Sequence, residues 1–155
     1  MWDEPRLDAL KHALQCAAIL ERTHPDDPEL IAAGLVHDVS DNVYPDHDDH
    51  DGRGAALVAP LLGARVAKLV GAHVVAKRYL VTADAAYRAT LSPRSVETLL
   101  EQGDVLDQTE RAALEADVDP DAMLELRRAD EGAKDPHAVV PDLASWRPLL
   151  ERLAQ

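Results

Sequence analysis

Apolar residues recur every three or four positions along most of the chain, which is the spacing that lines one face of a helix. No stretch shows the sustained alternation of apolar and polar residues that indicates a strand. The pattern therefore predicts an all-α, single-domain helical bundle over residues 1–155, with a polar loop at 39–51. We expect helices at residues 6–22, 28–38, 52–60, 64–79, 82–89, 93–102, 108–115, 120–134 and 142–154.

Three of these helix starts carry a specific signal. In "DDPEL", "LSPRS" and "VDPDA", a residue that caps helices well is followed by proline, which fits the first helical position. The capping residues are Asp27, Ser92 and Asp119.

The composition agrees with a helical core. Hydrophobic residues make up 46% of the chain and phenylalanine is absent, so the core must consist of Leu, Val and Ala. The net charge of -13 argues against nucleic acid or an anionic membrane as a partner. No apolar run approaches the roughly 20 residues of a membrane span, and "MWDEPRLDALKH" has no signal-peptide pattern. The one cysteine, Cys16, lies in apolar "LQCAAIL", which indicates a buried structural thiol in a cytoplasmic protein.

Candidate chemistry begins in the run "LIAAGLVHD", where the adjacent His37 and Asp38 end the most apolar predicted helix. In the predicted helix at 64–79, His73 continues the apolar face of Leu69 and Val70. A polar side chain that faces a core needs a hydrogen-bonding partner or a metal.

Two more polar residues share apolar faces. His12 lies on the face of Cys16 and Ile19, and Asp130 follows Leu126 on the inward face of its own predicted helix. The carboxylate in particular requires a partner or a cation in such a place.

These residues, together with a histidine of the polar loop, form a set of four imidazoles and two carboxylates without a thiolate. Such a set suits iron, manganese or zinc better than calcium, and six ligands are about right for two metals that share a bridging carboxylate. The candidate metal ligands are His12, His37, Asp38, His50, His73 and Asp130.

Simpler interpretations exist for each residue alone. A single core histidine is usually a hydrogen-bonded core residue, and "DHDDHD" at 46–51 is typical of a solvated acidic loop. Arg127 and Lys134 would then only neutralise Asp130 as a structural ion pair. We favour a metal site because the His-Asp doublet occurs together with three further histidines and a distal aspartate.

The order and spacing of these residues resemble the HD-domain superfamily, an all-helical fold named for its adjacent His-Asp pair. The segments "KHALQCA", "AAGLVHD", "HDGRGAALVAPLLG", "HVVAKRYL", "LSPRSVETLLEQGD" and "LRRADEGAK" are similar to one branch, over roughly residues 8–135. That branch contains mixed-valence di-iron oxygenases that cleave the carbon–phosphorus bond of 1-hydroxyphosphonates, and its type member forms glycine and phosphate. The myo-inositol oxygenases are more distant relatives.

The resemblance implies two iron ions, as an Fe(II)/Fe(III) pair, with an organophosphonate and dioxygen as the small molecules that bind. His12, His37 and Asp130 would hold one iron, and His50 and His73 would hold the other, with Asp38 as the bridge. Other divalent metals are possible in the protein as isolated.

Substrate residues follow from the same resemblance. Lys77 and Arg127 would bind the phosphonate rather than stay paired with carboxylates, and losing either would leave the iron content unchanged. Ser95, Thr98 and Gln102 share one helix face and offer uncharged hydrogen bonds to oxyanions. An ordinary polar helix surface is the alternative for that face.

The chain departs from the family in two places. The usual Tyr and Glu of a lid are missing from "MWDEPRLD", where Trp2 and Glu4 are the nearest candidates. The doublet continues as "HDVSD" rather than "HDIGH", so Asp41 stands where a histidine is common. We expect Asp41 to influence substrate choice by facing a cationic part of the substrate or Arg53, or else only to cap its loop through a backbone N–H.

Three functions are compatible with the sequence. The first is an O2-dependent oxygenase that converts a 1-hydroxyphosphonate to phosphate and a carboxylate. The second is a metal-dependent HD phosphohydrolase, in which the metals activate water and Lys77 and Arg127 bind a phosphate ester. The third is a non-catalytic HD module, against which the complete set of six ligands argues.

Overall fold

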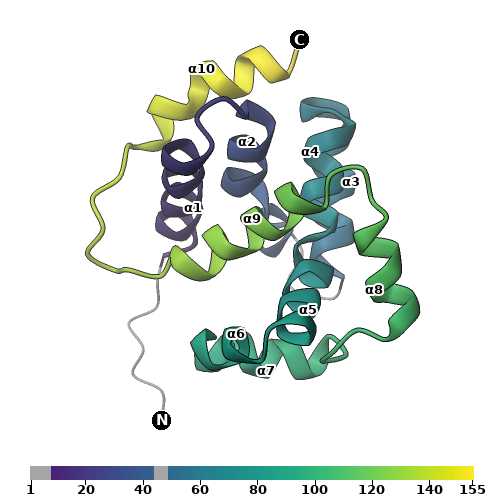
Figure 1. Cartoon of the computed structure of the whole chain (residues 1–155). Coiled ribbons are helices and arrows are strands. Elements are labelled where there is room, and N and C mark those ends of the chain that lie inside the picture. The colour runs from purple at the N-terminus through teal and green to yellow at the C-terminus, as the bar shows by residue number, and fades with distance from the viewer. Residues whose placement is uncertain (1–7, 44–48) are drawn as a thin grey trace.

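The computed structural model describes residues 8–43 and 49–155, which form ten α-helices and a short 3-10 helix, η1 (Figure 1). The all-α prediction is confirmed for this part of the chain. No helix in it is long and apolar enough to cross a membrane. The helices are α1 (Ala9–Thr23), α2 (Pro28–Val36), η1 (Val39–Asn42), α3 (His50–Leu62), α4 (Ala64–Gly71), α5 (His73–Ala83), α6 (Ala85–Thr90), α7 (Pro93–Glu101), α8 (Gln108–Glu115), α9 (Pro120–Gly132) and α10 (Leu143–Leu153).

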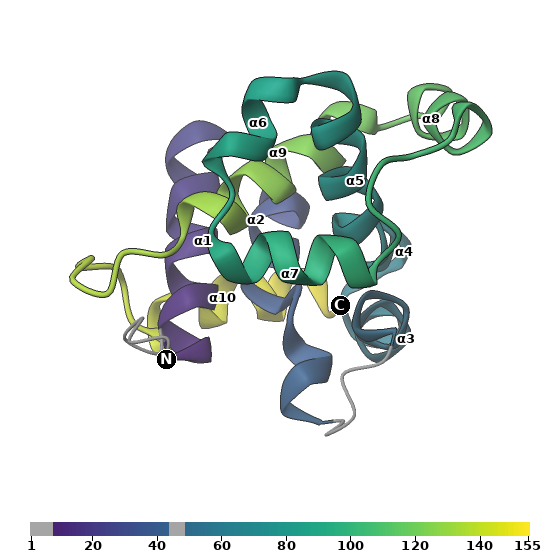
Figure 2. The same cartoon turned by 90° about the horizontal axis from the view of Figure 1, so that it is seen from below.

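The centre of the bundle consists of α1, α2, α4 and α9. Helix α2 contacts the other three, α9 crosses it and packs on α1 and α5, and α10 covers the end of the bundle opposite α6 and α7 (Figure 1). Figure 2 looks at the end that α7 covers. The largest fully buried side chains are leucines of α1, α2, α4, α7 and α9, namely Leu20, Leu30, Leu69, Leu99 and Leu126.

Close packing of α1 on α2 depends on Gly34. A Cβ atom at this position would lie 2.5 Å from Cδ1 of Leu20 and 3.2 Å from Sγ of Cys16. The absence of a side chain at Gly34 lets the two helices approach, and this brings His12 of α1 to His37 at the end of α2.

The three predicted helix starts at Pro28, Pro93 and Pro120 are confirmed. The Asp27 side chain accepts a hydrogen bond from the backbone of α2, and the Ser92 side chain does the same for α7. Asp119 makes no such bond, because its carboxylate accepts from Nε of Arg65 at 2.8 Å instead.

The prediction of one continuous helix at 64–79 is wrong. Helix α4 ends at Gly71, Ala72 has φ −100° and ψ −5°, and a new helix begins at His73. The periodicity continued across the break, so the sequence pattern did not reveal it. His73 is buried as expected, but it begins α5 instead of extending the face of Val70.

The predicted loop at 39–51 also differs from the structure. It contains η1, and its last two residues already belong to α3, so His50 is the first residue of a helix rather than a loop residue. Because His50 begins a helix, the hydrogen-bonded backbone of α3 restrains its position more than a loop would. The predicted helices at 28–38 and 82–89 are α2 and α6, and His37 lies just beyond the end of α2.

Replacing Arg65 with methionine should destabilise the fold. Its guanidinium binds Asp27 through two hydrogen bonds of 2.6 and 2.8 Å and Asp119 through a third, so it ties α4 to the starts of α2 and α9. These side chains are about one-third exposed, which reduces the expected loss of unfolding free energy to about 1–2 kcal/mol. Urea denaturation would measure this loss. Arg94→Met is the matched control, because the Arg94–Glu97 pair is mostly exposed and should contribute nothing measurable; equal losses in both variants would contradict the prediction.

Candidate metal centre

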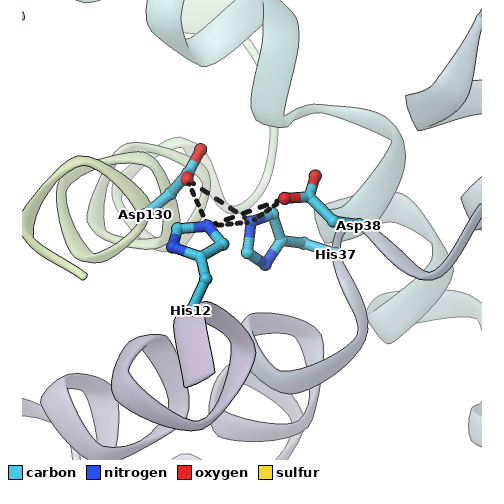
Figure 3. Close-up of side chains that lie close together, drawn as sticks. All are labelled: His12, His37, Asp38 and Asp130. Atoms are coloured by element: carbon cyan, nitrogen blue, oxygen red, sulfur yellow. Dashed lines mark hydrogen bonds and ion pairs between the residues drawn. The ribbon is translucent and has the colours of Figure 1, made fainter. Parts of the chain in front are cut away.

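Four of the predicted ligands meet between α1, the end of α2 and α9 (Figure 3). Nε2 of His12 lies 3.3 Å from Nε2 of His37 and 3.0 Å from Oδ1 of Asp130. Nε2 of His37 lies 3.4 Å from the same Asp130 oxygen and 3.2 Å from Oδ2 of Asp38. Two imidazole nitrogens and two carboxylate oxygens therefore converge on one point.

The other two predicted ligands lie on the far side of Asp38. Nε2 of His50 is 2.8 Å from Nε2 of His73, and Nε2 of His73 is 3.7 Å from Oδ1 of Asp38. One oxygen of Asp38 thus faces the first group and the other oxygen faces the second. This is the arrangement that a bridging carboxylate requires.

Three of the four imidazoles have their protonation pattern set by the backbone. Nδ1 of His12, His37 and His73 lies 2.6–2.8 Å from a carbonyl oxygen, which can only accept a hydrogen bond. Nδ1 therefore carries a proton in each ring, and Nε2 is the nitrogen directed into the site, where it can bind a metal once it holds no proton. The carbonyls belong to Ala133, Gly34 and Val70.

Such a donor set fits metal ions. Nε2 of His12 and Nε2 of His37 face each other at 3.3 Å, and a metal ion that displaces a proton held between them would be coordinated by both rings. Histidine nitrogens and carboxylate oxygens suit iron, manganese or zinc.

The electrostatics of the site are dominated by its buried carboxylates. Burial alone would lower the pKa of His37, but the charges of Asp38 and Asp130 raise it well above its ordinary value. Burial opposes ionisation of Asp130, yet Arg127 and His37 hold the pKa of that carboxyl well below its usual range. Burial and the charge of His37 lower the pKa of His73. Both carboxylates are thus ionised near neutral pH and attract cations.

Access to the site is on the side of Asp38. Its side chain is 34% exposed, whereas those of His37 and His73 are 0% and 5% exposed. A small molecule would therefore approach the metals along the Asp38 side. Two surface hollows of about 520 and 500 Å³ lie elsewhere and are not lined by any candidate ligand.

Comparison with known proteins decides the family. No protein-family model matches the chain. Hydroxymethylphosphonate dioxygenase of Gimesia maris is 34% identical over 152 residues, which cover 92% of this chain and 75% of that enzyme. The chain belongs to the phosphonate dioxygenase family.

Two further proteins are similar to this chain. A glycine-betaine-forming 1-hydroxy-2-(trimethylamino)ethylphosphonate dioxygenase of Leisingera caerulea is 28% identical over 92% of this chain and 77% of its own length. An uncharacterized protein of Acanthamoeba polyphaga mimivirus is 30% identical over 76% of this chain and 59% of its own length. The resemblance to phosphonate dioxygenases is thus confirmed, and the wider HD-domain assignment stays a prediction.

Three of the predicted substrate residues of this family member, Lys77, Ser95 and Thr98, lie on α5 and α7. Lys77 of α5 is buried, and its Nζ donates to Oγ1 of Thr98 at 2.9 Å and to the carbonyl of Ser95 at 3.5 Å. Burial and the nearby charge of Arg127 lower the pKa of Lys77 to about 8. A buried cation beside hydroxyl groups is suited to an anionic ligand.

Arg127 pairs with Asp130 and with Glu131 in this structure. Its role in binding the phosphonate stays a prediction. Its Nη2 also lies 3.4 Å from Oγ of Ser95. The structural ion pair with Asp130, which the sequence left open as an alternative, is therefore present, while Lys134 contacts Glu131 instead.

Glu131 was missed by the sequence reasoning. Its carboxylate accepts from Oγ of Ser95 at 2.8 Å, from Nζ of Lys134 at 3.0 Å and from the backbone N–H of Ser92 at 2.8 Å. The available signal was its position four residues after Arg127, a spacing at which opposite charges meet on a helix. Glu131 connects α9 to the start of α7.

The remaining predicted residues are only partly accounted for. Oε1 of Gln102 is buried without a hydrogen-bond partner among the described residues, as a ligand-binding group could be. Asp41 is exposed on η1, and its backbone N–H donates to the carbonyl of Asp38 at 3.1 Å. Trp2 and Glu4, the lid candidates, lie outside the described residues, and so does His47.

Proposed function

We propose that the chain is a di-iron oxygenase that oxidatively cleaves the carbon–phosphorus bond of a 1-hydroxyphosphonate to give phosphate and a carboxylate. The observation that carries this proposal is the position of Asp38, with one oxygen facing His12 and His37 and the other facing His73. Membership of the phosphonate dioxygenase family supports the reaction class. The relatives act on hydroxymethylphosphonate and on a trimethylamino-substituted 1-hydroxyphosphonate, according to their names.

In this proposal the six ligands act in two groups joined by Asp38. His12, His37 and Asp130 would hold one iron, and His50 and His73 would hold the other. A bound iron pair supplies the redox chemistry with dioxygen that amino-acid side chains lack. The backbone carbonyls that fix three of the imidazole rings keep the donor atoms in place before a metal arrives.

The other side chains would bind and orient the phosphonate. Lys77 offers a buried positive charge, the hydroxyl of Thr98 lies next to it, and α7 carries the hydroxyl of Ser95 one turn before Thr98. Gln102 continues the same helix face with a buried amide. A phosphonate held by these groups would place its C1 carbon toward the metals, because α5 carries both His73 and Lys77 one turn apart.

The oxygenase needs O2, whereas the alternative, a phosphohydrolase, does not. We expect phosphate release from hydroxymethylphosphonate, or another 1-hydroxyphosphonate, by the iron-loaded protein to stop under argon and to resume in air. Each phosphate released should consume one O2, because the hydroxyphosphonate and O2 together contain the atoms of the carboxylic acid and phosphate. An oxygen electrode and a phosphate assay on the same sample measure this ratio.

A phosphate monoester serves as the control substrate. It should not be cleaved in air or under argon. Phosphate release under argon at the aerobic rate would show that water, not oxygen, breaks the bond, and the chain would then be a phosphohydrolase.

A further inference from the structure

Arg127 contacts a proposed metal ligand directly. Its side chain is 5% exposed and lies on α9 one turn before Asp130, and its Nη1 donates to Oδ2 of Asp130. The other oxygen of Asp130, Oδ1, is the one that faces His12 and His37 at 3.0 and 3.4 Å. The carboxylate is therefore divided, with one oxygen toward the guanidinium and one toward the metal position.

This division restricts how Asp130 can bind a metal. An aspartate whose Oδ2 accepts a hydrogen bond from an arginine presents Oδ1 as its unoccupied oxygen, and the planar guanidinium restricts the plane of the carboxylate. The side chain of Asp130 is only 10% exposed, so water has little opportunity to replace the arginine. Hydrogen bonds of this kind to a ligand carboxylate orient it and affect metal affinity.

The second nitrogen of the guanidinium faces the opposite way, toward α7. Nη2 donates to Oε2 of Glu131 and lies 3.4 Å from Oγ of Ser95, which donates to the same Glu131 oxygen at 2.8 Å. The carbonyl of Ser95 accepts from Nζ of Lys77 at 3.5 Å. The guanidinium of Arg127 thus contacts Asp130, a proposed metal ligand, at one edge and the hydroxyl of Ser95, a proposed substrate residue, at another edge.

The third edge of the guanidinium is covered by Tyr87. The hydroxyl of Tyr87 lies beside Arg127, and both this oxygen and Nε of Arg127 are buried without a hydrogen bond of ordinary geometry among the described residues. Tyr87 packs on the small apolar cluster of α5 and α7. Asp130 and Glu131 therefore set the orientation of the guanidinium. Because the group is rigid, a displacement of the edge that contacts Asp130 also displaces the edge that contacts Glu131.

We propose that Arg127 is a positioning residue for the metal site as well as a part of the anion site, so that metal retention and anion binding are coupled through one guanidinium. This inference rests on the proposed function, because it needs a metal at Asp130. It replaces the expectation from the sequence that losing Arg127 leaves the iron content unchanged. Losing Lys77 should still leave the iron content unchanged, because its hydrogen bonds go to Thr98 and Ser95.

The test compares Arg127→Lys and Arg127→Gln with Lys77→Gln and the wild type. Each protein is loaded with Fe(II) under argon and then challenged with an excess of chelator, and the iron release rate is followed together with helical content by circular dichroism. We expect Arg127→Lys to release iron 10- to 100-fold faster than wild type, because lysine keeps the charge but cannot hold both carboxylates. Lys77→Gln should release iron at the wild-type rate.

Inorganic phosphate provides the second measurement. Phosphate should change the equilibrium affinity of the wild type for iron, measured against a competing chelator, because two coupled sites change each other's affinity by the same factor, and it should have no effect on Arg127→Lys. If Arg127→Gln folds poorly, Arg127→Lys decides the question alone.

Wild-type release rates in Arg127→Lys would overturn the inference, and so would equal acceleration in Lys77→Gln or no effect of phosphate on the wild type. A wild-type protein that binds no iron at all would instead overturn the proposed function.

Discussion

Asp38→Asn is expected to bind neither of the two irons that we propose for the wild type. Its two oxygens face the two groups of histidines separately, at 3.2 Å from Nε2 of His37 and 3.7 Å from Nε2 of His73. Asparagine has the same size but lacks the negative charge and one of the two acceptor oxygens. Both positions lose a ligand at once, so turnover should fall below detection. Elemental analysis of protein loaded with Fe(II) under argon measures the content directly.

The comparison with His73→Ala makes this prediction specific. That variant should lose one iron and keep the other, because His73 belongs to only one of the two groups. Asp121→Asn, an exposed aspartate on the same helix as Asp130, is the matched control and should retain both irons. After partial oxidation of the iron-loaded proteins, the proposed Fe(II)/Fe(III) pair should give an EPR signal in the wild type and in Asp121→Asn alone. A wild-type content that never exceeds one iron per chain would refute the two-metal proposal, and Asp38→Asn with one firmly bound iron would refute the bridge.

Lys77→Gln should weaken substrate binding strongly while leaving metal content unchanged. A buried charge-assisted hydrogen bond contributes about 1.5–3 kcal/mol, which corresponds to roughly a 10- to 150-fold loss of affinity. The measurement is the dissociation constant of a 1-hydroxyphosphonate under argon, where no turnover occurs. Normal affinity in this variant would remove Lys77 from the anion site.

The pH dependence gives an independent check on Lys77. Burial and Arg127 lower its pKa to about 8, Lys134 acts in the same direction, and Asp130 and Glu131 oppose the shift. The positive charge is present below this pKa and is lost as the pH rises through it, and bound metal cations would lower the pKa further. We therefore expect kcat/KM to fall as the pH rises above about 8 or slightly below.

Lys77→Arg separates this effect from titration of the substrate itself. Arginine stays charged throughout the range, so the fall in kcat/KM that belongs to Lys77 should disappear in this variant. Titration of the phosphonate is common to both proteins and cancels in the comparison. Identical pH profiles for Lys77→Arg and the wild type would contradict the assignment.

The donor set of the candidate metal centre could be predicted from the sequence because several of its residues are polar side chains at positions where the helix pattern expects apolar ones. A histidine or aspartate on an apolar helix face conflicts with burial unless something compensates, and His12, His73 and Asp130 all stood out for that reason. The structure places them within reach of His37 and Asp38, as the sequence reasoning expected. Their assignment to two irons came from the family resemblance and stays a proposal.

The anion-binding side was harder to predict because its important features are contacts across helices. Arg127 and Glu131 look like an ordinary surface pair four residues apart, and only the packing of α7 on α9 shows that Ser95 and Lys134 join them. The break between α4 and α5 was missed for a similar reason. Hydrophobic periodicity is insensitive to a single residue such as Ala72, at which one helix ends and the next begins.

The candidate ligands are distributed over much of the chain, and this has a consequence for the lifetime of the protein. His12 and Ala133, whose carbonyl fixes its ring, are 121 residues apart, so metals at this point would tie the first helix to the ninth. A ligand that binds only the folded state adds about 4 kcal/mol of stability when its free concentration is 1,000 times its dissociation constant. Under iron starvation this contribution would vanish, and the chain would open more often and be degraded by proteases. Iron supply would then control the amount of the enzyme as well as its activity.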